Sequence, residues 1–240
     1  MKRSLSKIRE WSLEIKIFSF VCFFLCFSVL SFADVLTSKK TVISGEEMEI
    51  RHYGDITVSR GNSKAVSGKN TITADKMTYN KKEETVDASG NVKLFSFTDD
   101  GEPVKAYGEF ALYNMPLGKG RLWGKNTFVE YFMKDSQKPL LLKAEEIELD
   151  RNLETLSARH NVEIAASSGT IVSDNAVYDR KTASVVMVKD KRRPLADVYY
   201  DGRSGVYEAD KMVFYNSATN KKIVMSGQVC GNVEMEDEIK

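Results

Sequence analysis

Cysteine is scarce in this sequence, with three residues in a chain of 240. Two of them, Cys22 and Cys26, fall in an apolar N-terminal block, so Cys230 is the only cysteine in the rest of the chain. A domain with one cysteine has no internal disulfide and depends on its core and its backbone hydrogen bonds. The 4 proline and 15 glycine residues are also too few for a collagen-like or low-complexity chain.

The sequence has no excess of positive charge outside its N-terminus. The chain holds 35 Lys and Arg against 34 Asp and Glu, and residues 1–33 contain five of the basic and two of the acidic residues, which leaves 30 against 32. Nucleic-acid binding draws its affinity from basic side chains that neutralise phosphates. The composition therefore disfavours a nucleic-acid partner.

Histidine is equally rare, which limits the chemistry available. His52 and His160 are the only two histidines, and with Cys230 they form no recognisable metal-ligand spacing and no Ser-His-Asp arrangement. Gly118, Gly120 and Gly124 match neither a P-loop nor a dinucleotide fingerprint. We therefore expect no metal, no cofactor and no enzymatic activity.

The N-terminus has the layout of an export signal. Basic residues precede the apolar block 17–30, and small residues at Ser31 and Ala33 suit signal peptidase. Cleavage after Ala33 would leave residues 34–240 as a single domain. The alternative is an uncleaved membrane anchor, although the block is short for a membrane span.

One short pattern recurs along the remaining chain. Each copy reads apolar, any, small, acidic, any, apolar, any, aromatic or Leu, and ends at Asn or Asp; the copies are residues 72–80, 106–114, 142–150, 171–179 and 207–216. The apolar residues are spaced by two, three and two, which fits neither a regular strand nor a helix. One extra residue after the small position, as in a β-bulge, would return all the apolar side chains to one face.

These repeats predict the fold class. β-rich runs such as 91–97 and 184–188 separate the copies, so each period supplies an outward and a returning strand. The chain is predicted to be all-β: an elongated antiparallel β-jelly roll, built as a two-sheet sandwich from repeated strand pairs. Its end strands would be open to strand addition by another copy or another protein.

The acidic position of the repeat has two interpretations. It is occupied by Asp75, Glu109, Glu145, Asp174 and Asp210. Paired carboxylates can cleave glycosides, but that chemistry needs two specific partners in one cleft. Five equivalent carboxylates instead favour a structural role, in which each side chain faces solvent and caps the bulge.

The residues 71–77, the turn Asp100-Gly101-Glu102-Pro103-Val104 and the pair Tyr113-Asn114 carry a family resemblance. Over residues 40–165 the sequence resembles the LptA/OstA-like family of periplasmic lipopolysaccharide transport proteins. The resemblance implies a twisted jelly roll whose interior holds acyl chains, and end-to-end contacts through edge strands with LptC-like and LptD-like partners or with further copies of the chain. A membrane-tethered LptC-like role, or a glycan-binding or glycan-cleaving β-repeat protein, remains an alternative.

The resemblance also assigns candidate binding residues for lipopolysaccharide. Apolar strand faces more often form a closed core, so the repeat pattern alone does not distinguish a groove from a core. A head-group contact is considered at Lys191, Arg192 and Arg193, because guanidinium groups bind phosphate well. The candidate groove lining consists of Ile72, Ala74, Met77, Tyr79, Leu94, Val104, Ala106, Tyr113, Ile147 and Leu149.

Overall fold

The computed structural model describes residues 42–235, except residues 68, 98–100, 102, 115, 132–138, 151, 167–168, 180, 183, 201–202 and 218–219. The expected signal or anchor at residues 1–33 lies outside this part of the chain. Within the described ranges, no helix has the length and hydropathy needed to cross a membrane. The one helix described there is a single 3-10 turn at His52–Gly54.

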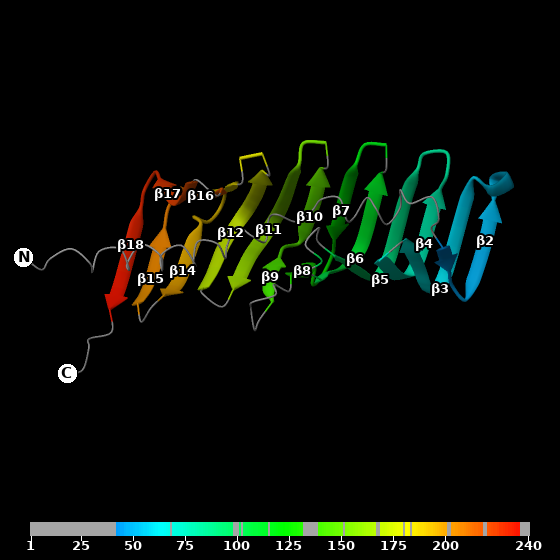
Figure 1. Ribbon diagram of the computed structural model, residues 1–240, viewed down its shortest axis with the longest axis horizontal. Helices are drawn as coiled ribbons and strands as arrows, with labels where there is room; N and C mark the ends of the chain where they lie inside the picture. The colour runs from blue at the N-terminus through cyan, green and yellow to red at the C-terminus, as the bar shows by residue number, and fades with distance from the viewer. Residues whose placement is uncertain are drawn as a thin grey trace, which may run out of the picture.

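The structure is an antiparallel β-protein of 18 strands, which confirms the predicted all-β class. The strands are ordered along the chain from one end of an elongated molecule to the other (Figure 1). Their bounds are β1 Val42–Ser44, β2 Glu47–Arg51, β3 Ile56–Ser67, β4 Asn70–Asn80, β5 Thr85–Phe97, β6 Pro103–Asn114, β7 Lys119–Trp123, β8 Phe128–Tyr131, β9 Leu140–Lys143, β10 Glu146–Asp150, β11 Thr155–Ala166, β12 Gly169–Asp179, β13 Ser184–Val188, β14 Leu195–Tyr200, β15 Arg203–Glu208, β16 Lys211–Ser217, β17 Asn220–Ser226 and β18 Cys230–Met235.

The strands form two walls. The first wall has the order β1, β3, β4, β5, β6, β8, β9, β11, β12, β14, β15, β18. The second has the order β2, β3, β4, β5, β6, β7, β10, β11, β12, β13, β16, β17. Six long strands, β3 to β6, β11 and β12, run through both walls. The two layers of the predicted sandwich are therefore parts of one continuous sheet that bends along a corner.

The corner explains the irregular spacing of the repeat. On β4, Ala74 and Met77 are both buried, while Asp75 and Lys76 between them are exposed. This confirms that an extra residue after the small position returns the apolar side chains to one face. In the strand ladder the returning strand is the longer one at the corner, because Gly90 and Asn91 of β5 stand opposite the single residue Glu109 of β6.

The outer ends of the strand pairs are closed by the last residue of each repeat. Asn80 Oδ1 accepts hydrogen bonds from the backbone N–H groups of Lys82 and Glu83, at 3.0 and 3.1 Å. Asn114, Asp150 and Asp179 make equivalent bonds at their own turns. The terminal Asn or Asp therefore makes the turn, as the repeat predicts.

A sixth copy of the repeat, missed in the sequence, lies at the N-terminal end. Residues 43–50 contain Gly45 at the small position and Glu46 at the acidic position, and they form β1 and β2. Only three described residues precede Gly45, and the last apolar position is Ile50 in place of an aromatic residue or Leu. The copy is recognisable once the spacing of 29 residues between Gly45 and Ala74 is compared with the interval between Ala144 and Ser173, which is also 29.

Candidate functional site

The space between the walls is lined by rows of apolar side chains that cross the strands. Each row is defined by the register, since directly opposed residues on neighbouring strands point to the same face. The first-wall row is Ile43, Ala65, Ile72, Leu94, Ala106, Val129, Leu142, Ile164, Ile171, Ala196 and Tyr207. The second-wall row is Met48, Ser59, Met77, Ala88, Ala111, Leu122, Ile147, Ala158, Ala176, Met187, Met212 and Met225.

The structure brings the predicted lining residues together on this inner face. Ile72, Leu94 and Ala106 occupy the first-wall row, and Met77 and Ile147 occupy the second-wall row. Tyr79, Tyr113 and Leu149 fall in the next inward row of the second wall, Val104 lies on the first wall, and Ala74 lies at the corner. Eight of the ten are buried, whereas Tyr79 and Leu149 are partly buried.

Sequence reasoning missed about half of the inner face. The missed members include Leu142, Ile164, Tyr178, Met187 and Phe214, all of which are buried. Leu142, Tyr178 and Phe214 stand at apolar positions of repeats that had already been identified, so carrying the lining through every copy would have found them. Ile164 and Met187 lie on returning strands, where the register is needed to assign a face.

The carboxylate of each repeat is held at the corner by the neighbouring strand. Asp174 accepts hydrogen bonds from the backbone N–H groups of Arg192 and Lys191, at 2.6 and 2.8 Å, and from Arg192 Nε at 3.0 Å. Because the carboxylate form accepts these bonds, with the Arg192 N–H the strongest influence, the pKa of Asp174 is lowered. The N–H of Gln228 and the guanidinium of Arg193 lower the pKa of Asp210 in the same way.

The other corners repeat this arrangement with an Asn donor. Asn91 Nδ2 donates to Asp75 Oδ2 at 2.9 Å. Asn62 does so to Glu46 at 2.6 Å, and Asn161 to Glu145 at 2.5 Å. These bonds confirm the capping role, and the Asn partners were not identified from the sequence. All three have a positive φ, so each bends the returning strand as well as holding the carboxylate.

The basic cluster predicted as a head-group contact takes part in the same corner system. Arg192 bonds to Asp174, and Arg193 Nε donates to Asp210 Oδ1 at 2.8 Å. Lys191 differs, since its side chain is exposed and has no carboxylate within ion-pair distance in the described ranges. These residues line a shallow hollow of about 490 Å³.

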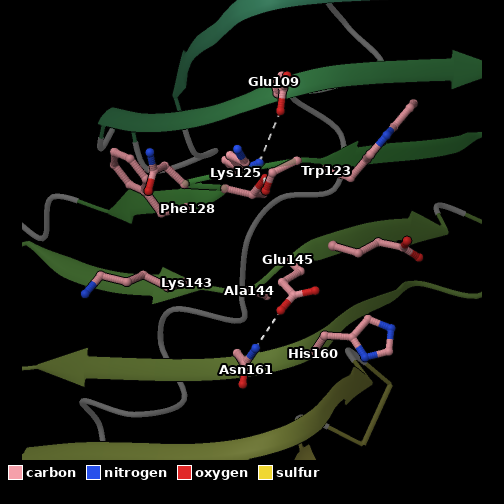
Figure 2. A pocket seen from close by; sticks show the side chains of 13 residues that line it. Glu109, Trp123, Lys125, Phe128, Lys143, Ala144, Glu145, His160 and Asn161 are labelled. Atoms are coloured by element: carbon pink, nitrogen blue, oxygen red, sulfur yellow. Dashed lines mark hydrogen bonds between the residues drawn. The ribbon is translucent and has the colours of Figure 1, made fainter.

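A larger hollow of about 950 Å³ lies on the outer side of the corner, where β7 and β8 adjoin β9 and β10. Figure 2 shows Glu109 and Glu145 at two neighbouring corners of this hollow, with Glu145 bonded to Asn161. Glu109 is held more loosely, by the N–H of Lys125 at 3.4 Å. The carboxylates belong to successive structural corners, so their placement follows from the repeat.

Aromatic and charged side chains support the outer face beside this hollow. Phe110 stacks on Trp123 with ring centroids 5.6 Å apart, and the Arg121 guanidinium lies 4.8 Å from the Trp123 ring centroid. Arg121 also pairs with Glu146. Burial acts to raise the pKa of Glu146, but the Arg121 hydrogen bond outweighs it and the pKa is lowered. This stack links β6, β7 and β10 from outside.

Residues 42–155 match the family model described as LptA/(LptD N-terminal domain) LPS transport protein. The chain contains an LptA/OstA-like domain. The match begins at β1 and ends at the start of β11, whereas the two walls continue through β18. β12 to β18 therefore extend the LptA/OstA-like domain by the same repeat.

Comparison with solved structures gives several matches to the fold containing the LptA/OstA-like domain. One is LptH, the LptA homologous periplasmic component of the conserved lipopolysaccharide transport device from Pseudomonas aeruginosa, at 14% identity and a TM-score of 0.33. The alignment covers 70% of this chain and 99% of that chain. Comparison with curated protein sequences gives no match.

Proposed function

We propose that this chain is a non-enzymatic carrier of lipopolysaccharide that acts in the periplasm and shields acyl chains between its two walls. The observation that carries the proposal is the continuous apolar inner face, which runs from β1 to β17 without an ionisable residue in either row. The family match to lipopolysaccharide transport proteins supports the choice of ligand.

The energetics of such a carrier require a continuous path. Each methylene group contributes roughly 0.8 kcal/mol on burial, so exposing an acyl chain of about twelve carbons to water costs on the order of 10 kcal/mol. Moving the chain from a bilayer into an apolar interior costs little by comparison, since both surroundings are apolar. Energy is then needed where the lipid leaves the inner membrane, and the carrier itself needs no nucleotide site.

A carrier between two membranes also needs partners at both ends. β1 and β2 each pair only with β3, so their other edges are open at one end of the molecule. β17 and β18 are open in the same way at the other end. We propose that these edges add strands from LptC-like and LptD-like partners, or from another copy of the chain, which would bridge the inner and outer membranes. If residues 1–33 are retained, the same fold suits a tethered LptC-like role.

Lys191 is the member of the basic cluster best suited to a lipid phosphate. Arg192 and Arg193 are committed to Asp174 and Asp210, whereas the Lys191 ammonium is exposed beside them. We therefore narrow the proposed head-group contact to Lys191, with the two arginines positioning its loop.

The carrier function is tested by lipid retention. The purified full chain is incubated with phosphatidylethanolamine vesicles that contain tritium-labelled lipid A, the vesicles are removed by flotation, and lipid A that stays with the protein is counted. The proposal predicts retained lipid A that excess unlabelled lipid A displaces and that an excess of its deacylated glycan does not. Displacement by the glycan alone would contradict the proposal and favour the glycan-binding alternative.

A further inference from the structure

The methionines of the chain are concentrated in one row of the inner face. Five of the nine methionines lie in the second-wall row. Met48 and Met77 flank Ser59 at its N-terminal end, and Met187, Met212 and Met225 are consecutive at its C-terminal end. The row between these groups is made of alanine, leucine and isoleucine.

Both ends of this row approach solvent. Met48 and its inward-facing neighbour Ile50 lie on the edge strand β2 and are 49% and 66% exposed. Met225 lies on the edge strand β17 and is partly buried. Large apolar side chains on an inner face that are exposed to water indicate that something apolar covers them in use.

Methionine differs from the residues in the middle of the row by its adaptability. Its unbranched side chain has three rotatable bonds and a polarisable sulfur, and it therefore fills irregular spaces and accommodates varied ligands. Isoleucine is restricted at χ1, and alanine has no side-chain rotamers. The ends of the interior can therefore change shape at little cost, while its middle keeps one geometry.

We propose that the two groups line the mouths through which fatty acyl chains enter and leave the interior. The N-terminal mouth consists of Met48, Ile50 and Met77, and the C-terminal mouth of Met187, Met212 and Met225. The occupant is the acyl part of lipopolysaccharide, because the mouths are continuous with the apolar rows and carry no ionisable side chain. This assignment rests on the proposed carrier function.

The C-terminal mouth belongs to the extension beyond the LptA/OstA-like match. The match ends at residue 155, and all three methionines of this mouth follow it. The extension thus lengthens the acyl path and supplies its second opening.

Photo-methionine labelling tests the mouths directly. The full chain is produced with photo-methionine in place of methionine, loaded with tritium-labelled lipid A from vesicles, illuminated and mapped by peptide mass spectrometry. Leu112→Met supplies the matched control, since Leu112 points outward from β6 and is 39% exposed. We expect lipid A adducts at both mouths at least five-fold above the adduct at position 112. Benzoylphenylalanine at Tyr113, in the middle of the interior, reports lipid capture independently.

The outcomes separate the mouths from the carrier function. Capture at Tyr113 without capture at the methionines would overturn the mouths and leave the carrier function in place. Capture at neither site would overturn both. Protein-to-protein adducts at Met48 and Met225 in place of lipid adducts would show that these ends are occupied by another chain, which also overturns the proposal.

A second variant tests the role of flexibility. Met212→Ile keeps an apolar side chain of similar volume but restricts χ1, a kind of exchange that cores tolerate. We expect lipid A loading to slow about three-fold while the amount retained at equilibrium is unchanged. Leu94→Ile, in the first wall among the central strands, is the control. Equal loading rates for the two variants would contradict a mouth at Met212.

Discussion

Replacement of Gly90 by alanine tests how the corner is built. Gly90 has a φ of +76°, and a Cβ atom added there would lie 2.3 Å from Asp75 Oδ2 and 2.9 Å from Asp75 Cβ. The contact with Cβ cannot be relieved by rotating the carboxylate alone. Gly90→Ala therefore pushes Asp75 away and disturbs its hydrogen bond from Asn91, 2.9 Å long.

The expected loss of stability has two parts. A left-handed backbone conformation costs an alanine about 1–2 kcal/mol relative to glycine. Overpacking against Asp75 adds about 1–3 kcal/mol. Gly101→Ala is the matched control, since Gly101 has a φ of +80° and no described atom within 4 Å of the added Cβ. It should show only the backbone part.

Stability is measured by urea denaturation together with native-state hydrogen exchange. The exchange measurement is needed because repeat proteins do not always unfold in one step. Gly90→Ala should lower protection in β4, β5 and β6 first. If Gly90→Ala is no more destabilising than Gly101→Ala, the proposed packing of the glycine against the carboxylate is wrong.

Three further predictions concern the corners, the core and the head group. The pKa values of Asp174 and Asp210 are lowered in the folded protein, so their stabilisation is complete above the unfolded pKa of about 3.9 and is lost as pH falls through the folded values; hydrogen exchange at decreasing pH should show β12 to β17 opening early, and early opening of β3 to β5 instead would contradict this. Leu142→Ala should cost about 2–5 kcal/mol in urea denaturation because the side chain is fully buried, whereas Leu141→Ala on the outer face should cost less than about 1 kcal/mol; similar losses would refute the assigned facing. Lys191→Gln should weaken lipid A retention about two- to five-fold at low salt, as expected for loss of one exposed charge contact, and unchanged retention would exclude this contact.

The repeat predicted much of the fold because it records a local geometry. The small residue, the acidic residue and the terminal Asn or Asp each meet a need of the chain within a few positions: space at the corner, a partner for neighbouring N–H groups, and a turn. Asp75 and Asn80 illustrate this, since both make the hydrogen bonds that their positions in the repeat suggest. The returning strands were less predictable because donors such as Asn91 and Arg192 differ from corner to corner.

The use of the interior was not predictable from the pattern alone. Alternation places Leu94 and Tyr113 on an inward face, but a filled core and an acyl path have the same alternation. The pairing of β6 with both β7 and β8 also depends on contacts that no single segment encodes. The family resemblance, and not the periodicity, supplied the choice of lipopolysaccharide as the ligand.

Site-specific photo-crosslinking at two adjacent residues of β6 tests the carrier most directly. Tyr113 faces the interior and is 2% exposed, whereas Leu112 faces outward and is 39% exposed. A benzoylphenylalanine is placed at each position, cells of the native host are illuminated, and adducts are probed for lipopolysaccharide. The account predicts adducts at position 113 and none at position 112. Capture at 112 alone, or at neither position in a folded and exported protein, would contradict a lipid path between the walls.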